Sequence, residues 1–142
     1  MQRVMVVNTV AGRQVVSTAT CWEPVIGYSR AVRSGDWIAV TGTLGLRPDG
    51  SCPASADEQM REAMAIIIAS VEALGGRKTD ILRTRIFVTD ISLWREIGRV
   101  HAEVLGDIRP ATTMVQVSAL ADPAAVLEVE ADALVSRPSS GS

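Results

Sequence analysis

The first forty residues of the chain are dominated by short apolar, β-branched runs, which predict β strands. Two such runs lie at Gln14–Thr18 and Trp37–Thr43, and the Arg-Ser-Gly-Asp segment at 33–36 reads as the turn of a hairpin. Pro48-Asp49-Gly50 then closes this β region, because proline presets φ and glycine accepts positive φ.

A change of period after this turn predicts the first of two helices. From Asp57 to Leu74 the apolar residues fall at helical spacing, and Ser55 and Glu58 form a capping-box pattern in front of them. Gly75-Gly76 follows as a stop signal. A second run with helical spacing extends from Ser92 to Leu105.

Three further strands are predicted at 82–89, 113–119 and 126–135. The apolar face of the first is expected to hold Leu82, Thr84, Ile86 and Val88. The last alternates apolar residues with acids. Strand groups interleaved with two helices predict an α+β fold, with one mixed sheet of five or six strands and both helices packed on a single face.

The opposite face of this sheet would then be uncovered. It is expected to carry Trp37, Thr41, Thr43, Arg85, Phe87, Met114, Gln116, Glu128 and Glu130. These residues are too apolar in part for an ordinary wet surface, so the pattern favours a neighbouring subunit on this face. The alternative is a solvated face, which antiparallel sheets can keep.

Length and composition indicate a single compact unit. The 142 residues suit one domain, expected over 1–135, followed by a polar tail at 136–142 that has nothing to bury and is expected to be disordered. No run approaches the ~20 apolar residues of a membrane span, and the N-terminus lacks a secretory pattern. A cytoplasmic protein without a membrane partner is therefore expected.

Charge and cysteine content exclude further classes. The formal net charge is −2, with 14 basic and 16 acidic residues, and no basic stripe is present to bind nucleic acid. Cys21 and Cys52 are far apart, and His101 is the only histidine. Neither a zinc site nor a disulfide framework is therefore expected.

Five motifs, in this order along the chain, together resemble those of one protein family. They are GYSRAV at 27–32, VTGT at 40–43, RTRIFVTD at 83–90, RPATT at 109–113 and LEVEA at 127–131. Together they resemble the reactive-intermediate deaminase family, RidA/YjgF. The resemblance extends from Trp22 to Val135, about four fifths of the chain.

The resemblance implies a homotrimer of chorismate-mutase-like subunits that associate through the uncovered sheet face. Each of three clefts would lie between two neighbours and bind a small metabolite. The chemistry implied is the hydrolysis of an imine, which needs no metal and no organic cofactor because the imine carbon is already electrophilic.

The family's two best-known site positions are only partly retained. The glutamate that positions the attacking water corresponds to Glu128, whereas the arginine that grips a substrate carboxylate is replaced by Thr112. A guanidinium offers a two-donor fork and a threonine only one uncharged donor, so the exchange costs about 2–4 kcal/mol of binding. Simple 2-imino acids are therefore not the expected substrates.

Three more residues are candidates near this position. Arg109 is either a substitute for the missing arginine or a solvated or interfacial loop residue. Gly98 stands where the family often has an asparagine, and the smaller residue is expected to leave room in the cleft. His101, on the same helix face, is either a proton shuttle or a histidine packed at a subunit boundary.

The remaining candidates would shape the pocket. Tyr28 is expected to wall it, Thr41 and Thr43 to offer hydroxyls, and Thr113 to help bind the substrate; packing and β-propensity are the competing explanations. Trp22-Glu23-Pro24 is either a lid or a surface anchor. Glu128 itself has a structural alternative, a cross-strand pair with Arg83 or Arg85 together with Glu130 and Asp132.

Two functions from different classes follow. The first is an enzyme that acts on a small enamine, imine or related carbonyl metabolite by hydrolytic deamination or proton transfer. In it Glu128 and His101 handle protons, and Thr112 binds an oxygen. The second is a trimeric protein that binds a small molecule without converting it.

Overall fold

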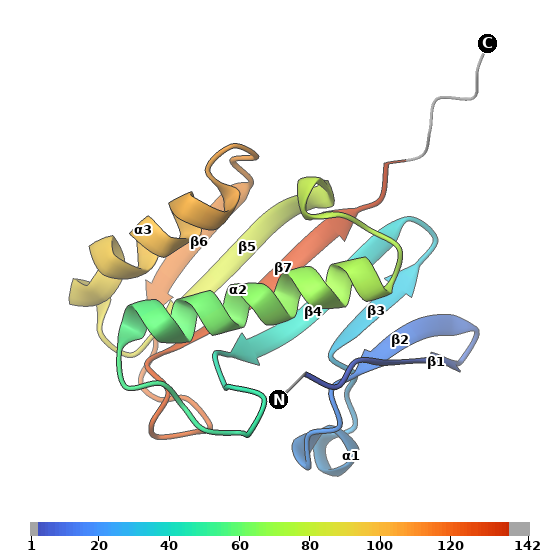
Figure 1. Ribbon diagram of the computed structural model, residues 1–142, viewed down its shortest axis with the longest axis horizontal. Helices are drawn as coiled ribbons and strands as arrows, with labels where there is room; N and C mark the ends of the chain where they lie inside the picture. The colour runs from blue at the N-terminus through green and yellow to red at the C-terminus, as the bar shows by residue number, and fades with distance from the viewer. Residues whose placement is uncertain (1–2, 137–142) are drawn as a thin grey trace.

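The computed structural model describes residues 3–136. Within this range seven strands form one sheet in the order β1-β2-β3-β4-β7-β5-β6 (Figure 1). They are β1 (Val6–Val10), β2 (Arg13–Ser17), β3 (Ala31–Ser34), β4 (Trp37–Leu44), β5 (Ile81–Val88), β6 (Ala111–Gln116) and β7 (Leu127–Leu134). The sequence analysis did not predict β1, which forms a hairpin with β2, and it implied β3 only through the hairpin turn at 33–36.

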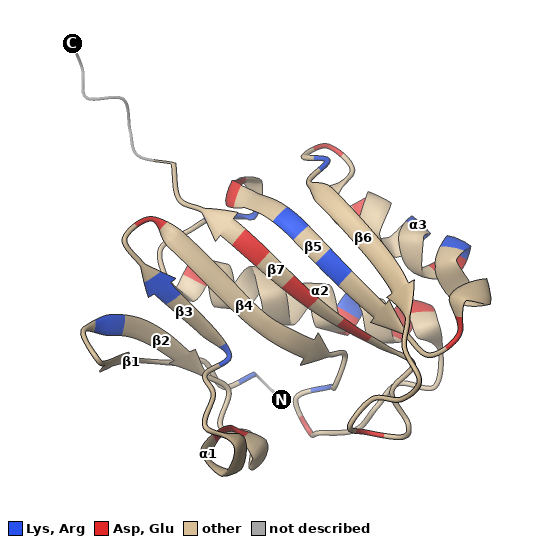
Figure 2. Ribbon diagram, turned by 180° about the vertical axis from the view of Figure 1, so that it is seen from behind, with Lys and Arg blue, Asp and Glu red and all other residues tan. Residues whose placement is uncertain are grey.

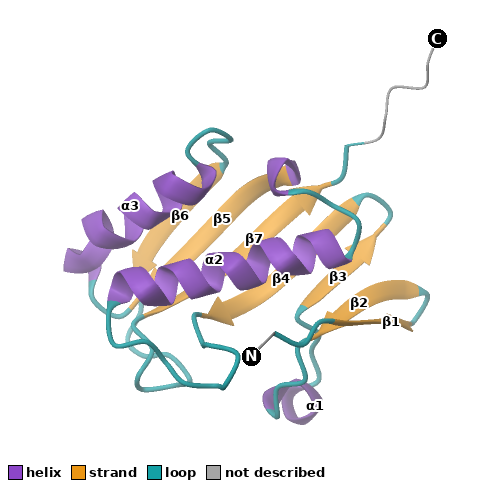
Figure 3. Cartoon of the chain, in the orientation of Figure 1, coloured by secondary structure: helices purple, strands orange, loops and turns teal. Residues whose placement is uncertain are grey.

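Two long helices cover one face of the sheet, as predicted (Figures 1 and 3). They are α2 (Ala56–Ala73) and α3 (Trp94–Leu105). The predicted cap of α2 is confirmed, because the Ser55 side chain accepts a hydrogen bond from the Glu58 backbone N–H. A short helix, α1 (Trp22–Ile26), precedes β3, and the 3-10 turns η1 (Lys78–Asp80) and η2 (Ile91–Leu93) precede β5 and α3. The α+β fold expected from the sequence is thus confirmed.

The last strand of the sheet lies at its centre. β7 pairs antiparallel with β4 on one side and with β5 on the other. β5 and β6 are parallel, because the chain crosses between them through α3, and the other pairs are antiparallel. This arrangement places the acids of β7 between β4 and β5 (Figure 2). They alternate with the buried apolar residues of β7, so they point to the face that no helix covers.

The core lies between the helices and the sheet. It is formed by apolar side chains from both layers, among them Ile38, Met60, Met64, Ile67, Val71, Ile86, Ile97, Val100, Leu127 and Val129. Each is at most 1% exposed. Burying a side chain of this size contributes about 1.5–3 kcal/mol, so this layer fixes the register of the strands that carry the polar residues.

Leu82 does not lie on the apolar face of β5, where the alternation placed it. The pairing of β5 with β7 shifts register between Ile81 and Arg83. Ile81 therefore enters the core and is 2% exposed, whereas Leu82 is 49% exposed. A bulge inserts one unpaired residue and so reverses which residue faces inward.

Three residues assigned to the uncovered face lie on the helix side instead. Thr43 pairs with the buried Val129, because a second register shift separates Val40 from Thr43. Met114 and Gln116 pair with Ile86 and Val88, which point into the core. The predicted strand at 113–119 begins earlier, at Ala111, and ends at Gln116.

The proposed boundary between domain and tail stays a prediction. Residues 137–142, which make up most of the predicted tail, lie outside the described range. Ser136 is within it, and its backbone N–H donates to Asp80 Oδ1 at 3.2 Å.

Candidate functional site

A cleft of about 790 Å³ opens where β3 and β4 meet the loops around α1 and the loop between β4 and α2. Tyr28, Arg30, Thr41, Thr43 and Glu128 are among the residues that line it. Four of the nine candidate site residues therefore lie together in one protomer. Arg30 is an addition that sequence reasoning had not singled out.

Glu128 lies at the start of β7, next to Leu44 of β4 and Phe87 of β5. Its side chain is half-buried and rests against Gly42, where an added β-carbon would overlap the Glu128 carboxylate oxygen Oε1. Among residues 3–136 this carboxylate forms no hydrogen bond and no ion pair. The carboxylate is therefore available to a ligand or to water.

The other acids of β7 are paired. Arg85 Nη1 lies 3.2 Å from Glu130 Oε1 and 3.2 Å from Asp132 Oδ2. The alternative in which all three acids form cross-strand pairs with arginine thus holds for Glu130 and Asp132, but not for Glu128.

The environment of Glu128 favours its protonated form. Burial raises the pKa of the Glu128 carboxyl above its usual value of 4.5, the positive charge of Arg30 opposes this rise, and Glu130 adds to it. A carboxyl whose pKa moves toward neutral can both accept and return a proton, which general acid–base chemistry requires.

Arg30 is held rigidly at the inner wall of the cleft. It is 7% exposed, and its Nη1 donates to Gly42 O at 2.9 Å and to Thr43 Oγ1 at 3.1 Å. Its guanidinium carbon lies 5.6 Å from the centre of the Tyr28 ring, within the range of a cation–π contact. Arg30 thus brings a fixed positive charge into the cleft that holds Glu128.

The two threonine hydroxyls of β4 are already engaged. Thr41 Oγ1 donates to Ser29 O at 2.7 Å, and Thr43 Oγ1 donates to Thr41 O at 2.6 Å. Each hydroxyl has a single hydrogen, so these groups would meet a ligand as acceptors.

α1 is fastened to the preceding loop by a buried carboxylate. Glu23 Oε2 accepts hydrogen bonds from the backbone N–H and the hydroxyl of both Thr18 and Thr20, at 3.0–3.2 Å. Burial alone raises the pKa of Glu23, but hydrogen bonds from Ser17, Thr20 and Thr18 lower it overall. The Trp22-Glu23-Pro24 segment is therefore anchored through Glu23, while Trp22 lines the cleft.

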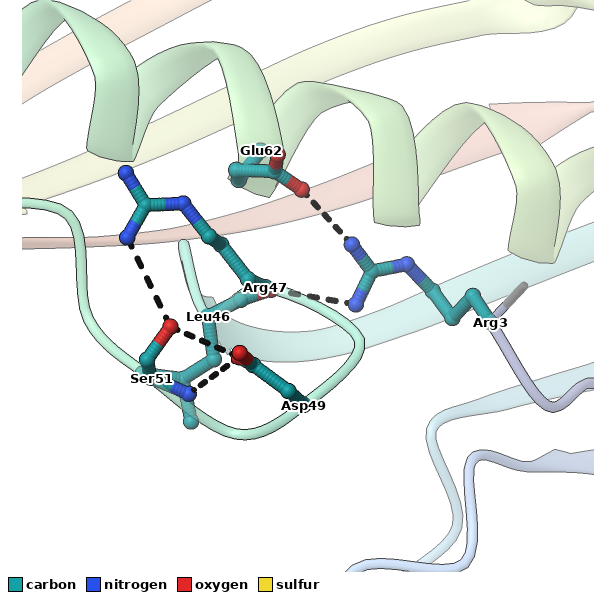
Figure 4. Close-up of polar contacts among 6 residues, drawn as sticks. All are labelled: Arg3, Leu46, Arg47, Asp49, Ser51 and Glu62. Atoms are coloured by element: carbon teal, nitrogen blue, oxygen red, sulfur yellow. Dashed lines mark hydrogen bonds and ion pairs between the residues drawn. The ribbon is translucent and has the colours of Figure 1, made fainter. Parts of the chain in front are cut away.

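The outer rim of the cleft is closed by the N-terminal segment. Arg3 donates to Glu62 Oε2 of α2 at 2.7 Å and to Leu46 O at 3.1 Å (Figure 4). In the neighbouring turn, Asp49 Oδ1 accepts from the Ser51 backbone N–H at 2.9 Å and from its hydroxyl at 2.6 Å. These contacts fix the loop between β4 and α2 against the body of the protein.

Thr112 and His101 form a separate cluster on the helix side of the sheet. Thr84 Oγ1 lies 2.8 Å from Thr112 Oγ1 and 2.9 Å from His101 Nε2. Thr112 pairs with Thr84, which is fully buried, whereas Glu128 pairs with Phe87 on the uncovered face. The expected meeting of Glu128 with Thr112 therefore does not occur within one protomer.

The other three candidates also lie away from the cleft of their own chain. Gly98 lies on α3 with open space where a β-carbon would be. Arg109 is exposed in the loop before β6, with its backbone in the left-handed region at φ 57. Thr113 pairs with Arg85 and is exposed on the uncovered face. Burial lowers the pKa of His101 below its usual 6.5, which favours the neutral imidazole.

Sequence reasoning missed Arg30 and Gly42. Both lie inside recognised motifs, at 27–32 and 40–43. Their importance depends on how they pack in the folded protein, which the spacing of apolar residues does not show. The available signal was chemical: an arginine placed between the only tyrosine of the sequence, Tyr28, and the apolar pair Ala31-Val32.

Among residues 3–136, no group of three or more histidine, cysteine, aspartate or glutamate side chains is placed to hold a metal ion. Cys21 is exposed and Cys52 half-buried, and both are free thiols. No helix in the described part of the chain is long and apolar enough to cross a membrane.

Comparison with known proteins places the chain among close structural relatives. The sequence model of the family described as Endoribonuclease L-PSP matches residues 18–135. The crystal structure of Rv2704 from Mycobacterium tuberculosis, a member of the YjgF/YER057c/UK114 family, is 44% identical with a TM-score of 0.80, covering 87% of this chain and 99% of that one. E. coli TdcF with bound serine is 28% identical with a TM-score of 0.73, covering 77% and 88%.

A third relative carries an enzymatic name. The 2-iminobutanoate/2-iminopropanoate deaminase of Dermatophagoides farinae is 27% identical over 120 residues, which cover 83% of this chain and 93% of that protein. The family model matches residues 18–135, a range that includes β4 and β7, whose residues line the cleft.

Proposed function

This chain belongs to the RidA/YjgF family, and on that premise we propose that it is a cytoplasmic homotrimer that hydrolyses a small reactive enamine, imine or related carbonyl metabolite. The name of the Dermatophagoides farinae relative supports this reaction class. The observation that carries the proposal is the half-buried Glu128 carboxylate, which lines the cleft with a raised pKa and no partner among residues 3–136.

In the proposed reaction, Glu128 accepts a proton from a water molecule as the water oxygen bonds to the imine carbon. The protonated Glu128 returns this proton to the nitrogen, which gives a carbinolamine. Glu128 then takes the hydroxyl proton of the carbinolamine and passes it to the nitrogen as the carbon–nitrogen bond breaks, so that ammonia and a carbonyl product leave. The raised pKa of Glu128 suits both steps, because the same group must accept and donate near neutral pH. Desolvation of the carboxylate in the cleft also makes it a stronger base than it would be in water.

The trimer supplies a role for the candidates that lie outside this cleft. Thr112 and Gly98 are near the β6 edge on the helix side, so they can approach a Glu128 only from a neighbouring subunit. Arg109 and Thr113 lie at the same edge. We propose that this edge of one protomer closes the cleft of the next, and that a protomer isolated in solution as a monomer is inactive. Light scattering on the purified protein tests this assembly.

The function is tested with imines generated freshly from several amino acids and amines, followed by the release of ammonia or carbonyl product. Glu128→Gln keeps the shape of the side chain but cannot carry the proton. We expect it to lower kcat/KM by about 100-fold or more, the usual contribution of a general base. Glu130→Gln is the matched control, because Glu130 lies two residues away on the same strand face and is paired with Arg85.

Two outcomes would contradict the proposal in different ways. Full activity of Glu128→Gln would remove Glu128 from the reaction. No acceleration by the wild type over buffer, across the whole panel, would instead favour the second candidate, a trimeric protein that binds a small molecule without converting it.

A further inference from the structure

Arg30 is a buried cation without an acidic partner. It is 7% exposed, and among residues 3–136 no carboxylate oxygen lies within 4.0 Å of its guanidinium nitrogens. Glu128 is close enough for its carboxyl to sense the positive charge, but it makes no ion pair with Arg30. A charge removed from water in this way is expected to be matched by an anion, because an unpaired buried ion is strongly destabilising.

The hydrogen bonds of Arg30 are concentrated on one end of its guanidinium. Nη1 donates to Gly42 O at 2.9 Å and to Thr43 Oγ1 at 3.1 Å. Nε is buried and has no hydrogen-bond partner among the described residues. Nη2 has only a long contact, 3.4 Å, with the Tyr28 hydroxyl.

The edge formed by Nε and Nη2 is therefore the part of Arg30 that lacks a strong acceptor. Two parallel N–H donors on one guanidinium edge match the two oxygens of a carboxylate and bind it in a bidentate manner. The Nη1 contacts hold the side chain in place, so little conformational entropy remains to be lost on binding. The half-buried Tyr28 hydroxyl is the group that would give way to the incoming oxygen.

We propose that Arg30 binds a carboxylate of the ligand through its Nε–Nη2 edge, in the same cleft and from the same protomer as Glu128. The inference rests on the proposed function and extends it, since it assigns a ligand class to that cleft. It also restores to the site the positive charge that Thr112 does not supply. The anion would then enter from the β3–β4 side of the cleft and not from the β6 edge.

The test compares two probes of nearly equal shape, butanoate and butanamide, titrated into the full-length protein by calorimetry. The wild type is expected to bind butanoate more tightly than butanamide. Arg30→Gln should weaken butanoate binding about 10- to 100-fold, the range for loss of charge-assisted hydrogen bonds, and leave butanamide unchanged. Arg30→Lys keeps the positive charge but not the two-donor fork, so its affinity for butanoate should lie between those of the wild type and Arg30→Gln.

Arg85→Gln is the matched control. It removes one arginine charge from the uncovered face, where Arg85 is paired with Glu130 and Asp132, and should leave butanoate binding unchanged. Equal binding of butanoate by the wild type and Arg30→Gln would overturn the proposal. Tighter binding of inorganic phosphate than of butanoate would overturn the assignment to a carboxylate.

A measurement on the wild type keeps the proposal testable if the Arg30 variants do not fold. The Arg30 Nε–H resonance should move downfield as butanoate is added, and an unmoved resonance would overturn the proposal. A resonance that changes on Glu128→Gln but not with butanoate would also overturn it, because Glu128 itself would then occupy the edge. Arg30-dependent anion binding without imine turnover would leave this inference standing while the proposed hydrolase function failed.

Discussion

Two polar clusters of this protein lie at separate places on the sheet and differ in how their charged and polar groups are paired. In the His101 cluster, the hydroxyls of Thr84 and Thr112 and the imidazole bond to one another, and burial lowers the pKa of His101, which favours the neutral imidazole. In the cleft, Arg30 and Glu128 are both removed from water and do not form an ion pair with each other.

The two clusters therefore differ in whether their buried polar groups have partners within the described part of the chain. A buried polar group that is satisfied internally contributes to stability, whereas an unsatisfied one costs free energy. Strain of that kind is retained in proteins where it serves binding or catalysis. Mutations in the cleft should therefore mainly lower activity, whereas mutations in the His101 cluster should mainly lower stability.

Gly42→Ala should show the largest effect on the cleft. The new β-carbon would overlap Glu128 Oε1 and displace the carboxylate, which is the end of a flexible side chain. A displacement of about 1 Å can cost ~100-fold in rate, so we expect kcat for imine hydrolysis to fall by about that factor while urea unfolding changes little. Unchanged activity would show that the position of Glu128 is not critical.

Thr84→Val, in the His101 cluster, should lower stability more than activity. Thr84 is fully buried, and its hydroxyl lies 2.9 Å from His101 Nε2 and 2.8 Å from Thr112 Oγ1. Valine keeps the shape but removes both hydrogen bonds, at an expected cost of about 1–3 kcal/mol in the free energy of unfolding. Urea denaturation measures this loss. A stability equal to that of the wild type would contradict the structural role of the cluster.

The pH dependence of stability distinguishes the clusters further. The pKa of Glu128 is raised in the folded protein, so its ionisation opposes folding as pH rises from 4.5 through the folded pKa. Glu128→Gln should therefore be more stable than the wild type at pH 7, and this gain should shrink as pH falls toward 4.5. Thermal unfolding across pH 4–7 measures the difference, and a variant less stable at pH 7 would contradict the unpaired state of Glu128.

The ionisation of His101 should change stability with pH in the opposite direction to that of Glu128. Its folded pKa lies below 6.5, so the folded protein binds fewer protons than the unfolded chain in this range. Its contribution to stability is present above pH 6.5 and is lost as pH falls from there through the folded pKa. The same series of thermal unfolding curves should show this loss in both the wild type and Glu128→Gln.

Gly98→Ala should have the smallest effect. A β-carbon at Gly98 meets no atom of the same chain, and alanine within a helix is favoured over glycine by about 0.5–1 kcal/mol. The protomer should therefore be slightly stabilised. If the variant instead dissociates the oligomer or weakens ligand binding, as measured by light scattering and calorimetry, the space over Gly98 is occupied by a neighbour or a ligand.

The spacing of apolar residues was sufficient to predict the helix and sheet layers of the fold, but not which residues of each strand face the core. The spacing of apolar residues in α2 and the capping pattern at Ser55 and Glu58 predicted the helix to within one residue at each end. It failed at Leu82 and Thr43, because a bulge adds one residue and inverts the alternation from there. Bulges depend on pairing with distant strands, which a single stretch of sequence does not show.

The candidate site was predictable where a motif carried the chemistry. Glu128 and Tyr28 were found through their motifs, and both line the cleft. The meeting of Glu128 with Thr112 in a cleft between subunits stays a prediction, because within one protomer the parallel pairing of β6 with β5 turns Thr112 to the helix side. Arg30 was missed because its importance comes from burial without an acidic partner, and burial arises only when β3 and β4 are assembled.

The central position of β7 has a consequence for biosynthesis. Its two neighbours, β4 and β5, are made well before it, so on the ribosome each has an unpaired edge until β7 emerges and inserts between them. Pairings so distant in sequence form slowly, and open edges invite aggregation. The nascent chain should therefore depend on chaperones until late in translation, and Glu128 would reach its place against Gly42 only when β7 inserts.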